Sequence, residues 1–465
     1  KYRKYPLCYK IPLFIGLLLR KNKSKYISKR NLALSEERFI PLFESNLLGG
    51  ASVINGCVHM LGSKLQWNAI LKKFNANYED LIKSYNDLYS FDLNIKNKIS
   101  LQTSSQNIID KAFINALRDE NIPLGNMDYS DEVACGPILN TSKKFFRTSV
   151  LTLIKKQYFK RLMDEKVEKI LFNDNNEAIG LKTNKQLIDS DFVILCGGVI
   201  GTCSILLNGK NNNAINSPLH NLPVGNNVQD HTNLRINILT KKSINSLNEI
   251  SGSFFKKLQL VINHFSGKTT LMIGTGATSA AHLDLDEDGE VDTRIQIVQF
   301  TESGRVGSDG KLFSTIKPGF SISITAIKPQ SKGIVGLNGE SDIVNPMYLS
   351  KKEDIDLLKL ALKFCLKLLR SGEMSKNILE IADENEIVNS PEKYIYKNFY
   401  SGYHLIGGSH DAINSNFSIH NTKGLYVCDA SVFNKYAASN IHSSVVLVAD
   451  IFAKKFINQN FLSNK

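Results

Sequence analysis

The sequence predicts a mixed α/β fold, in which a doubly wound βαβ-type unit carries an inserted antiparallel sheet. Residues 191–207 and 424–456 each read as a buried strand followed by a helix, the pieces of a doubly wound unit. Between them, residues 239–313 are richer in segments that alternate apolar and polar side chains, which favours an antiparallel sheet with one wet face. The sheet-forming middle therefore interrupts the α/β part along the chain.

Length and composition place the chain among globular proteins. Its 465 residues correspond to two or three structural units at roughly 150 residues each. Hydrophobic residues make up 42% and charged residues 22%, so the chain can bury a core without a disulfide or a metal. No apolar run approaches the roughly 18 residues that a spanning helix needs, so we expect no integral membrane segment.

The net charge of +13 raises the question of an anionic partner such as nucleic acid. The lysines are spread along the chain, and in the densest basic stretch, residues 1–30, Tyr2, Tyr5 and Tyr9 crowd at one end before an apolar run. We therefore expect no nucleic-acid partner.

Seven widely spaced cysteines without a CxxC pair exclude zinc ribbons and thioredoxin-type motifs, and they indicate a reduced, cytoplasmic protein.

The start of the chain imitates a signal peptide. A basic head begins at Lys1, which stands where Met is usual, and an apolar stretch follows at residues 11–19. However, Pro12 interrupts the stretch, and residues 20–23 are basic or polar where a small-residue cleavage site is needed. We expect instead a sequence that begins inside a domain.

The elements follow in order along the chain. Residues 166–172 and 178–182 predict two strands joined by a turn, and residues 191–196 predict a buried strand that ends at Gly197 and leads into a helix over 200–207. Residues 293–300 predict a half-polar strand, and 354–372 predict a long amphipathic helix. Residues 424–429 predict a second buried strand, after which Asn440 caps a helix over 442–456.

Two tempting motifs carry no site. Residues 274–279 fall short of GxGxxG because Ser279 replaces the third glycine, and a loop in a β region fits better. Residues 284–292 match the opening positions of a calcium loop, but Ile295 replaces its last ligand and strands flank it. We therefore expect a solvated acidic hairpin tip and no metal site.

Five glycine-containing segments form the informative pattern. Glycines let backbone N–H groups approach a diphosphate or a flavin edge, which a dinucleotide cradle requires. The segments read LLGGASVING at 47–56, GGVIGT at 197–202, PVGNNVQDH at 223–231, YHLIGG at 403–408 and DASVF at 429–433. Any one of them alone is more often a structural turn than a cofactor contact.

In this order the segments resemble the glucose–methanol–choline (GMC) flavoprotein oxidoreductases, of the choline-dehydrogenase-like type. The family's stretches read like GGSSxIN, SAGAIGSPxLLL, VGxNLQDH, YHxxGT and GLRVVDASVxP, and the resemblance covers about residues 40 to 460. It implies an enzyme that oxidises the CH–OH group of a polyol, sugar or choline-like alcohol by hydride transfer to flavin N5. Oxygen or a quinone-type carrier would accept the electrons.

The resemblance also implies a cofactor site and three domain segments. FAD would contact Gly49, Gly50, Ser52 and Asn55, with Val167 against the adenine and Gly197, Asp429 and Ala430 at the second glycine turn. The segments are an FAD-binding domain over 1–235, a substrate-binding domain over 236–400, and a return to the FAD-binding domain over 401–465.

Departures from the family pattern limit these expectations. The family's opening strand, GxGxxG turn and acidic ribose contact are missing from these 465 residues, so the FAD-binding domain is N-terminally incomplete. Ala51, Cys203 and Asn434 stand where the family has Ser/Thr, Pro and Pro. No His lies in the cradle, so we expect non-covalent FAD. A truncated, non-catalytic relative that cannot hold FAD is the alternative, and a basic module for an anionic partner is a remote one.

The catalytic candidates are His404, Asn440 and His442. His404 stands in the position of the family's catalytic His, and Asn440 and His442 form an N–x–H pattern at the predicted helix start. An imidazole suits the base that takes the hydroxyl proton. The partner of His404 is either His442 or Asn440, and the sequence leaves this choice open.

Overall fold

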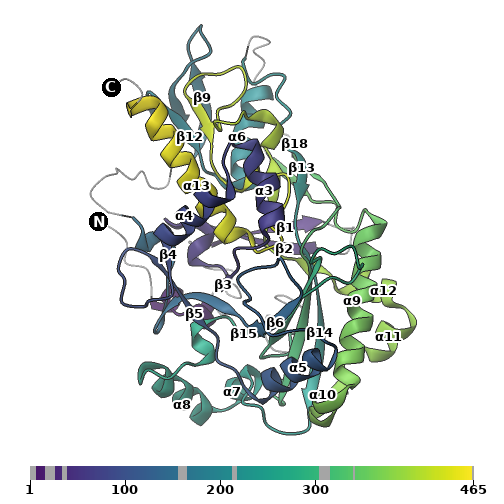
Figure 1. The fold of residues 1–465 in the computed structure, drawn as a ribbon. Coiled ribbons are helices and arrows are strands. Elements are labelled where there is room, and N and C mark those ends of the chain that lie inside the picture. The colour runs from purple at the N-terminus through teal and green to yellow at the C-terminus, as the bar shows by residue number, and fades with distance from the viewer. Residues whose placement is uncertain are drawn as a thin grey trace.

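The computed structural model describes residues 7–15, 27–33, 39–154, 165–211, 217–302, 315–338 and 341–462. Two regions stand one above the other in Figure 1. The upper one holds the helices α6 (Gly198–Asn211) and α13 (Ile441–Ile457), and the lower one holds the largest sheet. Residues 16–23 of the signal-peptide-like stretch lie outside the described residues. Within the described part of the chain, no helix has the length and apolarity to cross a bilayer.

The upper region contains the predicted βαβ-type pieces. β12 (Val193–Leu195) pairs in parallel with β23 (Leu425–Val427), although more than two hundred residues separate them in the chain. β12 leads directly into α6, and β23 is followed by the turn that reaches α13. The doubly wound unit that the sequence predicted is therefore confirmed by the pairing of strands from its two halves.

Smaller sheets surround this pair. The predicted strands at 166–172 and 178–182 are β9 and β10, joined as expected by a tight turn. The antiparallel groups are β11-β10-β9, β13-β22 and β18-β19. Their bounds are β9 (Val167–Phe172), β10 (Ala178–Thr183), β11 (Leu187–Asp189), β13 (Asn226–Gln229), β22 (Ile406–Gly408), β18 (Ile334–Asn338) and β19 (Ser341–Asn345).

The lower region is built on a seven-stranded antiparallel sheet. Its order is β20-β14-β17-β16-β15-β6, with β21 paired to the side of β14. The strands are β6 (Ala134–Pro137), β14 (Thr232–Thr240), β15 (Ala277–Leu283), β16 (Thr293–Val298), β17 (Gly319–Ala326), β20 (Ile378–Ile381) and β21 (Tyr400–Ser401). The antiparallel middle is confirmed. Of the loop predicted at 274–279, residues 274–276 precede β15 as a loop, whereas residues 277–279 belong to β15.

The predicted wet face of this sheet is wrong. Every residue of β15 and of β17 is buried, and β16 exposes only Gln296 in part. Alternation along a strand reports two chemically different faces, and a polar face lined by other parts of the protein reads like a solvated one. The polar side chains of these strands therefore point into the protein.

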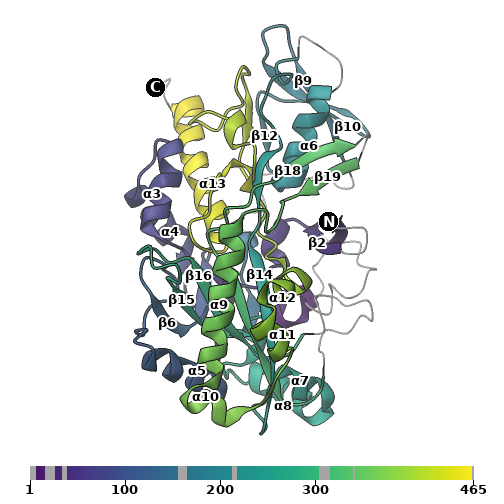
Figure 2. The same cartoon turned by 90° about the vertical axis from the view of Figure 1, so that its right-hand side faces the viewer.

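The long helix α9 (Lys352–Arg370) covers the other face. It runs along the sheet (Figure 2), packs against β17, and buries an apolar stripe that includes Leu358, Leu362 and Leu369. Short helices continue from it along the edge: α10 (Gly372–Asn377), α11 (Glu384–Asn389) and α12 (Pro391–Asn398). The predicted helix over 354–372 is thus confirmed within two residues at each end.

The N-terminal part links both regions. β1 (Ile27–Ala33) and β2 (Phe39–Ser45) form an antiparallel ribbon, and β3-β7-β5-β4 form a further sheet with β8 beside β7. α4 packs against α13 although the two lie at opposite ends of the chain (Figure 1). The bounds are α1 (Leu7–Lys10), β3 (Val58–His59), α3 (Lys64–Lys73), α4 (Tyr78–Leu88), β4 (Tyr89–Ser90), β5 (Ile99–Thr103), α5 (Ile108–Asp119), β7 (Leu139–Lys143), β8 (Phe146–Arg147), α7 (Leu247–Gly252) and α8 (Phe254–Phe265).

Candidate active site

Two histidines meet between β21, β22 and the start of β14, and their hydrogen bonds fix which nitrogens carry protons. Nδ1 of His404 lies 3.0 Å from Nδ1 of His231. Nε2 of His231 lies 3.2 Å from the carbonyl oxygen of Ile327, and because a carbonyl only accepts, this nitrogen carries a hydrogen. A neutral His231 then has its lone pair on Nδ1, so the Nδ1–H of His404 donates to it. The basic nitrogen of a neutral His404 is therefore Nε2.

His231 is kept neutral by its surroundings. Burial, followed by the charges of His404 and Arg294, holds the pKa of His231 well below its usual value. The ring of Tyr436 lies against the imidazole with centroids 3.8 Å apart. His231 is thus a positioning residue that fixes the tautomer of His404. The sequence segment 223–231 contains it, but nothing in one sequence separates its role from that of a turn residue.

The backbone of His404 is anchored on both sides. Its N–H donates to Oδ1 of Asp230 at 2.8 Å, and its carbonyl accepts from the Tyr436 hydroxyl at 2.9 Å. The Asp230 carboxylate also accepts from the hydroxyls of Ser401 and Tyr348, and burial raises the pKa of Asp230 despite these bonds. The imidazole therefore sits on a rigid support rather than on a mobile loop.

The second catalytic candidate, His442, belongs to a different cluster. It lies in the first turn of α13, where Asn440 is the N-cap and donates to the carbonyl of Val58 at 3.4 Å. Burial, followed by the charges of His59 and Arg147, lowers the pKa of His442 to about 3. Its Nε2 is buried and has no hydrogen-bond partner. His442 is therefore neutral, with an unused polar atom beside the N-terminus of α13.

The predicted glycine cradle borders this second cluster. Gly49 and Gly50 have φ of +94° and +53°, a conformation that side chains disfavour, and the Ser52 hydroxyl donates to the Gly49 carbonyl at 2.6 Å. Oδ1 of Asn55 accepts from the Cys57 N–H at 3.1 Å and from the Arg147 guanidinium. The side chains of Ser52 and Asn55 are thus taken up by these hydrogen bonds, and the backbone of the two glycines is what the cradle offers to a ligand.

Arg147 is a half-buried cation that has no carboxylate partner among the described residues. Its Nε and Nη2 are buried without a hydrogen-bond partner, and burial lowers its pKa. A charge in a low-dielectric site is costly unless it is paired. Arg147 therefore fits a ligand that carries negative charge next to the glycine cradle, as a dinucleotide does. The RTS sequence at 147–149 gave no signal for this role.

The second glycine turn is organised by Asp429. Its Oδ2 accepts from the Gly198 N–H at 2.9 Å and from the Thr202 hydroxyl at 2.5 Å, and its Oδ1 accepts from the Ser431 N–H at 2.8 Å. Burial raises the pKa of this carboxyl. Asp429 thereby joins the start of α6 to the turn that begins at Ala430.

This turn stands where a doubly wound sheet binds its ligand. Gly197 and Asp429 follow the carboxyl ends of β12 and β23, and ligands bind beyond those ends in α/β folds. Val167 begins β9 in the same upper region (Figure 1) and is half-buried. The structure thus brings Gly197, Asp429 and Ala430 together, and it places Gly49, Gly50, Ser52 and Asn55 in the other cluster.

A third polar group lies on the inner face of the large sheet. His282 on β15 is opposite Arg294 on β16, and Arg294 is opposite Thr325 on β17. Arg294 is 4% exposed, and it donates to the sulfur of Met60 at 2.6 Å. Burial lowers the pKa of Arg294 to about 10. The orphaned buried atoms on this face are Arg294 Nε, His282 Nδ1 and Nε2, Gln296 Oε1 and Asn233 Oδ1. Such a face suits a polar ligand.

Family models described as GMC oxidoreductase match residues 25–233 and residues 329–449. The chain belongs to the GMC oxidoreductase family. The resemblance seen in the sequence is therefore confirmed.

Individual relatives are distant. Glucose dehydrogenase (FAD, quinone) of Drosophila melanogaster is 23% identical over 306 residues, which cover 58% of this chain and 47% of that protein. The chloroplastic fatty acid photodecarboxylase of Chlamydomonas reinhardtii is 23% identical over 314 residues, 59% of this chain and 51% of that protein. The chain spans about half the length of the curated relatives it matches.

Solved structures share the fold at low sequence identity. A formate oxidase superposes with a TM-score of 0.85 at 15% identity, covering 98% of this chain and 92% of that one. Pyridoxine 4-oxidase from Mesorbium loti superposes with a TM-score of 0.77 at 14% identity, covering 95% and 90%. The mixed α/β architecture with its antiparallel sheet is thus the GMC oxidoreductase fold.

Proposed function

We propose that the chain is part of an FAD-dependent oxidoreductase that oxidises an alcohol, with His404 as the base. The observation that carries this proposal is the hydrogen-bond relay from the Ile327 carbonyl through His231 to His404, which leaves Nε2 of His404 basic. A base of this kind needs its lone pair on a defined nitrogen and an ordinary proton affinity. The hydrogen bond to the neutral, buried His231 meets the first need, because it leaves the lone pair of His404 on Nε2.

Non-covalent FAD is the cofactor that the polar groups fit. When bound, FAD supplies the acceptor for the hydride. Gly49, Gly50, Ser52 and Asn55 would hold it on one side, next to the unpaired Arg147. Gly197, Asp429 and Ala430 would hold it at the second turn, with Val167 towards the adenine. No histidine lies between residues 49 and 55, which supports a non-covalent cofactor.

The protein residues would divide the chemistry between them. Nε2 of His404 accepts the hydroxyl proton of the substrate while the carbon loses hydride. His231 holds the ring in the required tautomer, and Asp230 with Tyr436 hold its backbone. The N-terminus of α13, at Asn440 and His442, stabilises negative charge that develops nearby. Either Asn440 or His442 orients the substrate oxygen.

The substrate class follows from the family and from the sheet face. We propose a polyol, sugar or choline-like alcohol, because relatives include glucose dehydrogenases (FAD, quinone) and because the inner face of the sheet presents unpaired polar atoms. Oxygen or a quinone-type carrier would be the electron acceptor. Residues 1–235 and 401–465 would form the FAD-binding domain, and residues 236–400 would form the substrate-binding domain of a cytoplasmic enzyme.

The test replaces His404 in the complete protein, expressed from the full gene with whatever precedes Lys1. His404→Ala should retain FAD, because the cofactor contacts lie elsewhere, and should slow flavin reduction by an alcohol about 10²–10⁴-fold. His420→Ala, at an exposed histidine, is the matched control and should reduce at the parent rate. Rapid-mixing absorbance at the flavin band measures this step.

Two outcomes would refute the proposal in different ways. Flavin reduction in His404→Ala within a few-fold of the parent would remove this residue from the mechanism. A complete protein that purifies without flavin and does not take it up would favour the non-catalytic relative. Asn440→Ala and His442→Ala, measured side by side, identify the partner as the residue whose loss slows reduction more.

A further inference from the structure

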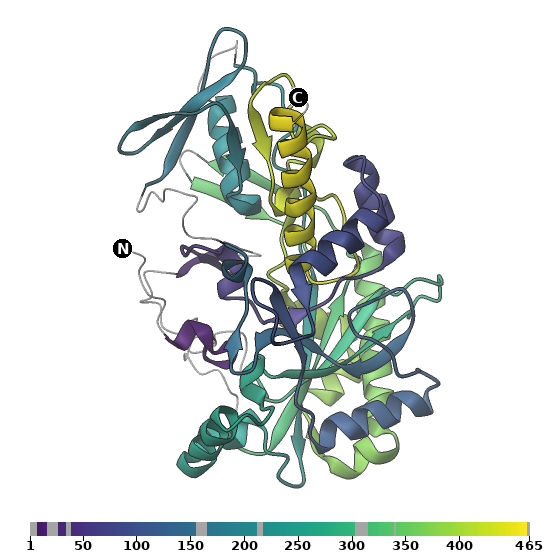
Figure 3. The same cartoon turned by 60° about the vertical axis from the view of Figure 1, so that its left-hand side comes forward.

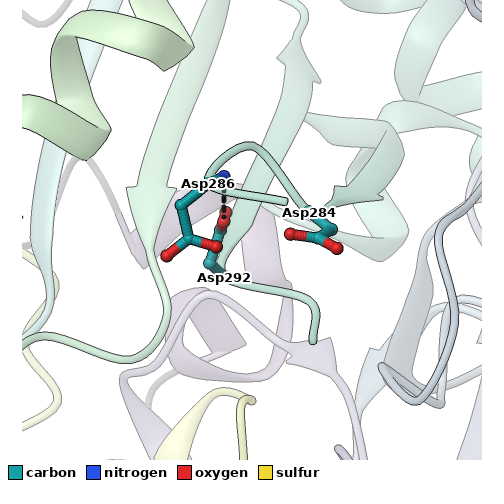
Figure 4. A group of neighbouring side chains, drawn as sticks. All are labelled: Asp284, Asp286 and Asp292. Atoms are coloured by element: carbon teal, nitrogen blue, oxygen red, sulfur yellow. Dashed lines mark hydrogen bonds between the residues drawn. The ribbon is translucent and has the colours of Figure 1, made fainter. Parts of the chain in front are cut away.

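Three aspartates converge at the tip of the hairpin between β15 and β16 (Figure 4). One carboxylate oxygen from each of Asp284, Asp286 and Asp292 lies within 4.8 Å of the others. Oxygens bound to one Ca²⁺ at 2.3–2.6 Å are at most about 5 Å apart. The spacing of the three oxygens is therefore compatible with a single shared cation.

Burial distinguishes this cluster from an ordinary acidic turn. Asp292 is 2% exposed, and its Oδ1 is buried without any hydrogen-bond partner, as is Oδ1 of Asp284. The other oxygen of each is well supplied: Oδ2 of Asp292 accepts from two backbone N–H groups at 2.8 and 3.0 Å, and Oδ2 of Asp284 accepts from Gly289 at 2.9 Å. The sequence expectation of a fully solvated tip is therefore wrong at Asp292.

Charge compensation is missing from the cluster. The nearby Lys328 points its Nζ at Glu290 (3.0 Å) and Asp288 (4.0 Å) on the outer side of the loop. Within the described residues, no ion pair reaches the three aspartates. Three carboxylates that gather without a counter-charge repel one another, so the cluster favours a cation.

We propose that this hairpin tip binds a calcium ion. Asp284, Asp286 and Asp292 occupy positions 1, 3 and 9 of a D-x-D-x-D-G loop, and Gly289, at φ +89°, makes the sharp turn at position 6. Ile295 replaces the bidentate Glu of position 12, so water completes the coordination and the affinity is low, with Kd of about 10⁻⁴–10⁻³ M. The prediction of no metal site is revised by the buried, unpartnered oxygens.

The position of the ion gives it a structural consequence. The loop begins after Leu283 and ends before Thr293, which pair across the hairpin, and the next pair inwards is His282 with Arg294. A bound ion would clamp the ends of both strands next to the polar face of the sheet. Calcium would therefore hold Arg294 and His282 in register.

The test is a calorimetric titration of the chain with CaCl₂ after removal of metal by a chelator. The parent should bind one ion with the Kd given above, and the double variant Asp284→Asn/Asp286→Asn should bind at least tenfold more weakly. Glu287→Gln removes one negative charge from an exposed position of the same loop outside the cluster and should bind like the parent. Circular dichroism without metal checks that each variant folds.

Three results would overturn the calcium site. They are an absence of binding heat in the parent at concentrations tenfold above the expected Kd range, binding by the double variant equal to the parent, and Mg²⁺ binding as tightly as Ca²⁺. Thermal melts give a second measurement, because a loss of calcium binding and a loss of folding change the melting temperature differently. Without metal, the double variant should melt at or above the parent temperature, because it has lost repulsion, and only the parent should gain from added calcium.

An independent observation concerns helix α8 at the outer edge of the lower region (Figure 3). Six large apolar side chains of this helix are exposed, and Phe254 and Phe255 reach 73% and 81%. At 100° per residue all six fall within one arc of about 120°. They are Phe254, Phe255, Leu258, Val261, Ile262 and Phe265. The helix thus turns its apolar face outwards.

The surroundings of this face are basic. Lys257 lies on the helix, Lys268 follows it, and Lys144 precedes Phe145, whose carbonyl contacts Nε2 of His264 at 3.0 Å. All three lysines are exposed. Residues 250–283 contain no Asp or Glu at all. An apolar helix face with lysines beside it and no acids matches the surface of an anionic bilayer.

We infer that α8 docks on a membrane surface that carries anionic lipid. The chain, sedimented with vesicles, should bind phosphatidylserine-containing vesicles at least tenfold more tightly than pure phosphatidylcholine, and added salt should weaken binding. Phe254→Ser/Phe255→Ser should lose binding at least tenfold. Leu187→Ser, at a side chain 65% exposed in the upper region, is the control and should bind like the parent.

Other occupants of the α8 face give distinguishable results. Equal binding by Phe254→Ser/Phe255→Ser and the parent would overturn the inference. A parent that ignores vesicles but forms a dimer in solution, which the same double substitution converts to a monomer, would assign the face to a second copy instead.

Discussion

The two histidine clusters of the candidate active site are held in different ways. His404 is hydrogen-bonded to His231, and His231 is hydrogen-bonded in turn to the carbonyl of Ile327. His442 has a buried Nε2 without a partner and shares its environment with the unpaired guanidinium of Arg147. The first cluster is satisfied by contacts within the described residues, whereas in the second the guanidinium of Arg147 has no carboxylate partner among them. We therefore propose that the first cluster does the proton chemistry and that the second lies next to the cofactor.

The largest difference in stability should appear between variants of two half-buried arginines, Arg235 and Arg147. Arg235 pairs with Glu302 at 2.9 Å, so Arg235→Met should lower the free energy of unfolding by about 3–5 kcal/mol. Arg147 has no carboxylate partner among the described residues, so Arg147→Met should raise the free energy of unfolding by about 1 kcal/mol in the absence of FAD, since an uncompensated charge is removed. Urea denaturation measures both. If Arg147→Met destabilised the chain as much as Arg235→Met, the second cluster would not lack an anion.

Removing the relay should have the next largest effect. His231→Leu takes away the acceptor that fixes the tautomer of His404, and such indirect partners contribute about 10–100-fold. Flavin reduction in the complete protein should slow by that factor, while FAD stays bound because its contacts lie elsewhere. An unchanged rate of flavin reduction would mean that the relay does not matter.

The pH dependence of stability tests the second cluster. His442 titrates at a pKa of about 3 in the folded chain and at about 6.5 when unfolded. Below pH 6.5 the unfolded chain takes up the proton first, so stability falls as the pH falls, by about 1.4 kcal/mol per pH unit for this residue. His442→Gln should make the slope shallower by that amount between pH 6 and 5, and His420→Gln should leave it unchanged.

The smallest effect should come from Tyr436→Phe. This substitution removes the hydroxyl that donates to the His404 carbonyl and keeps the ring against His231. We expect a loss of about 0.5–1.5 kcal/mol in stability and a change of only a few-fold in flavin reduction. A loss of rate as large as that of His231→Leu would show that the backbone anchor, and not the tautomer, limits catalysis.

Local sequence patterns predicted much of the fold. The apolar run before Gly197, the leucine stripe of α9 and the cap at Asn440 predicted elements that the structure contains almost residue for residue. These patterns work because burial selects apolar residues at the period of the element that carries them. The prediction of a solvent-exposed face on the large sheet was wrong for a related reason. The period of apolar residues along a strand indicates which residues share a face, but it does not indicate what packs against that face.

The sequence by itself therefore determined the family, the elements and the positions of His404, Asn440, His442 and the glycine turns. Only the tertiary structure decided the partners: His231 for His404, Arg147 beside the cradle, and Arg294 inside the sheet face. His404 and His231 stand 173 positions apart, and Arg147 stands 92 from Asn55. A contact between residues so distant in the chain leaves no periodic trace, because the packing of whole elements brings the two residues together and no repeat along the chain records it.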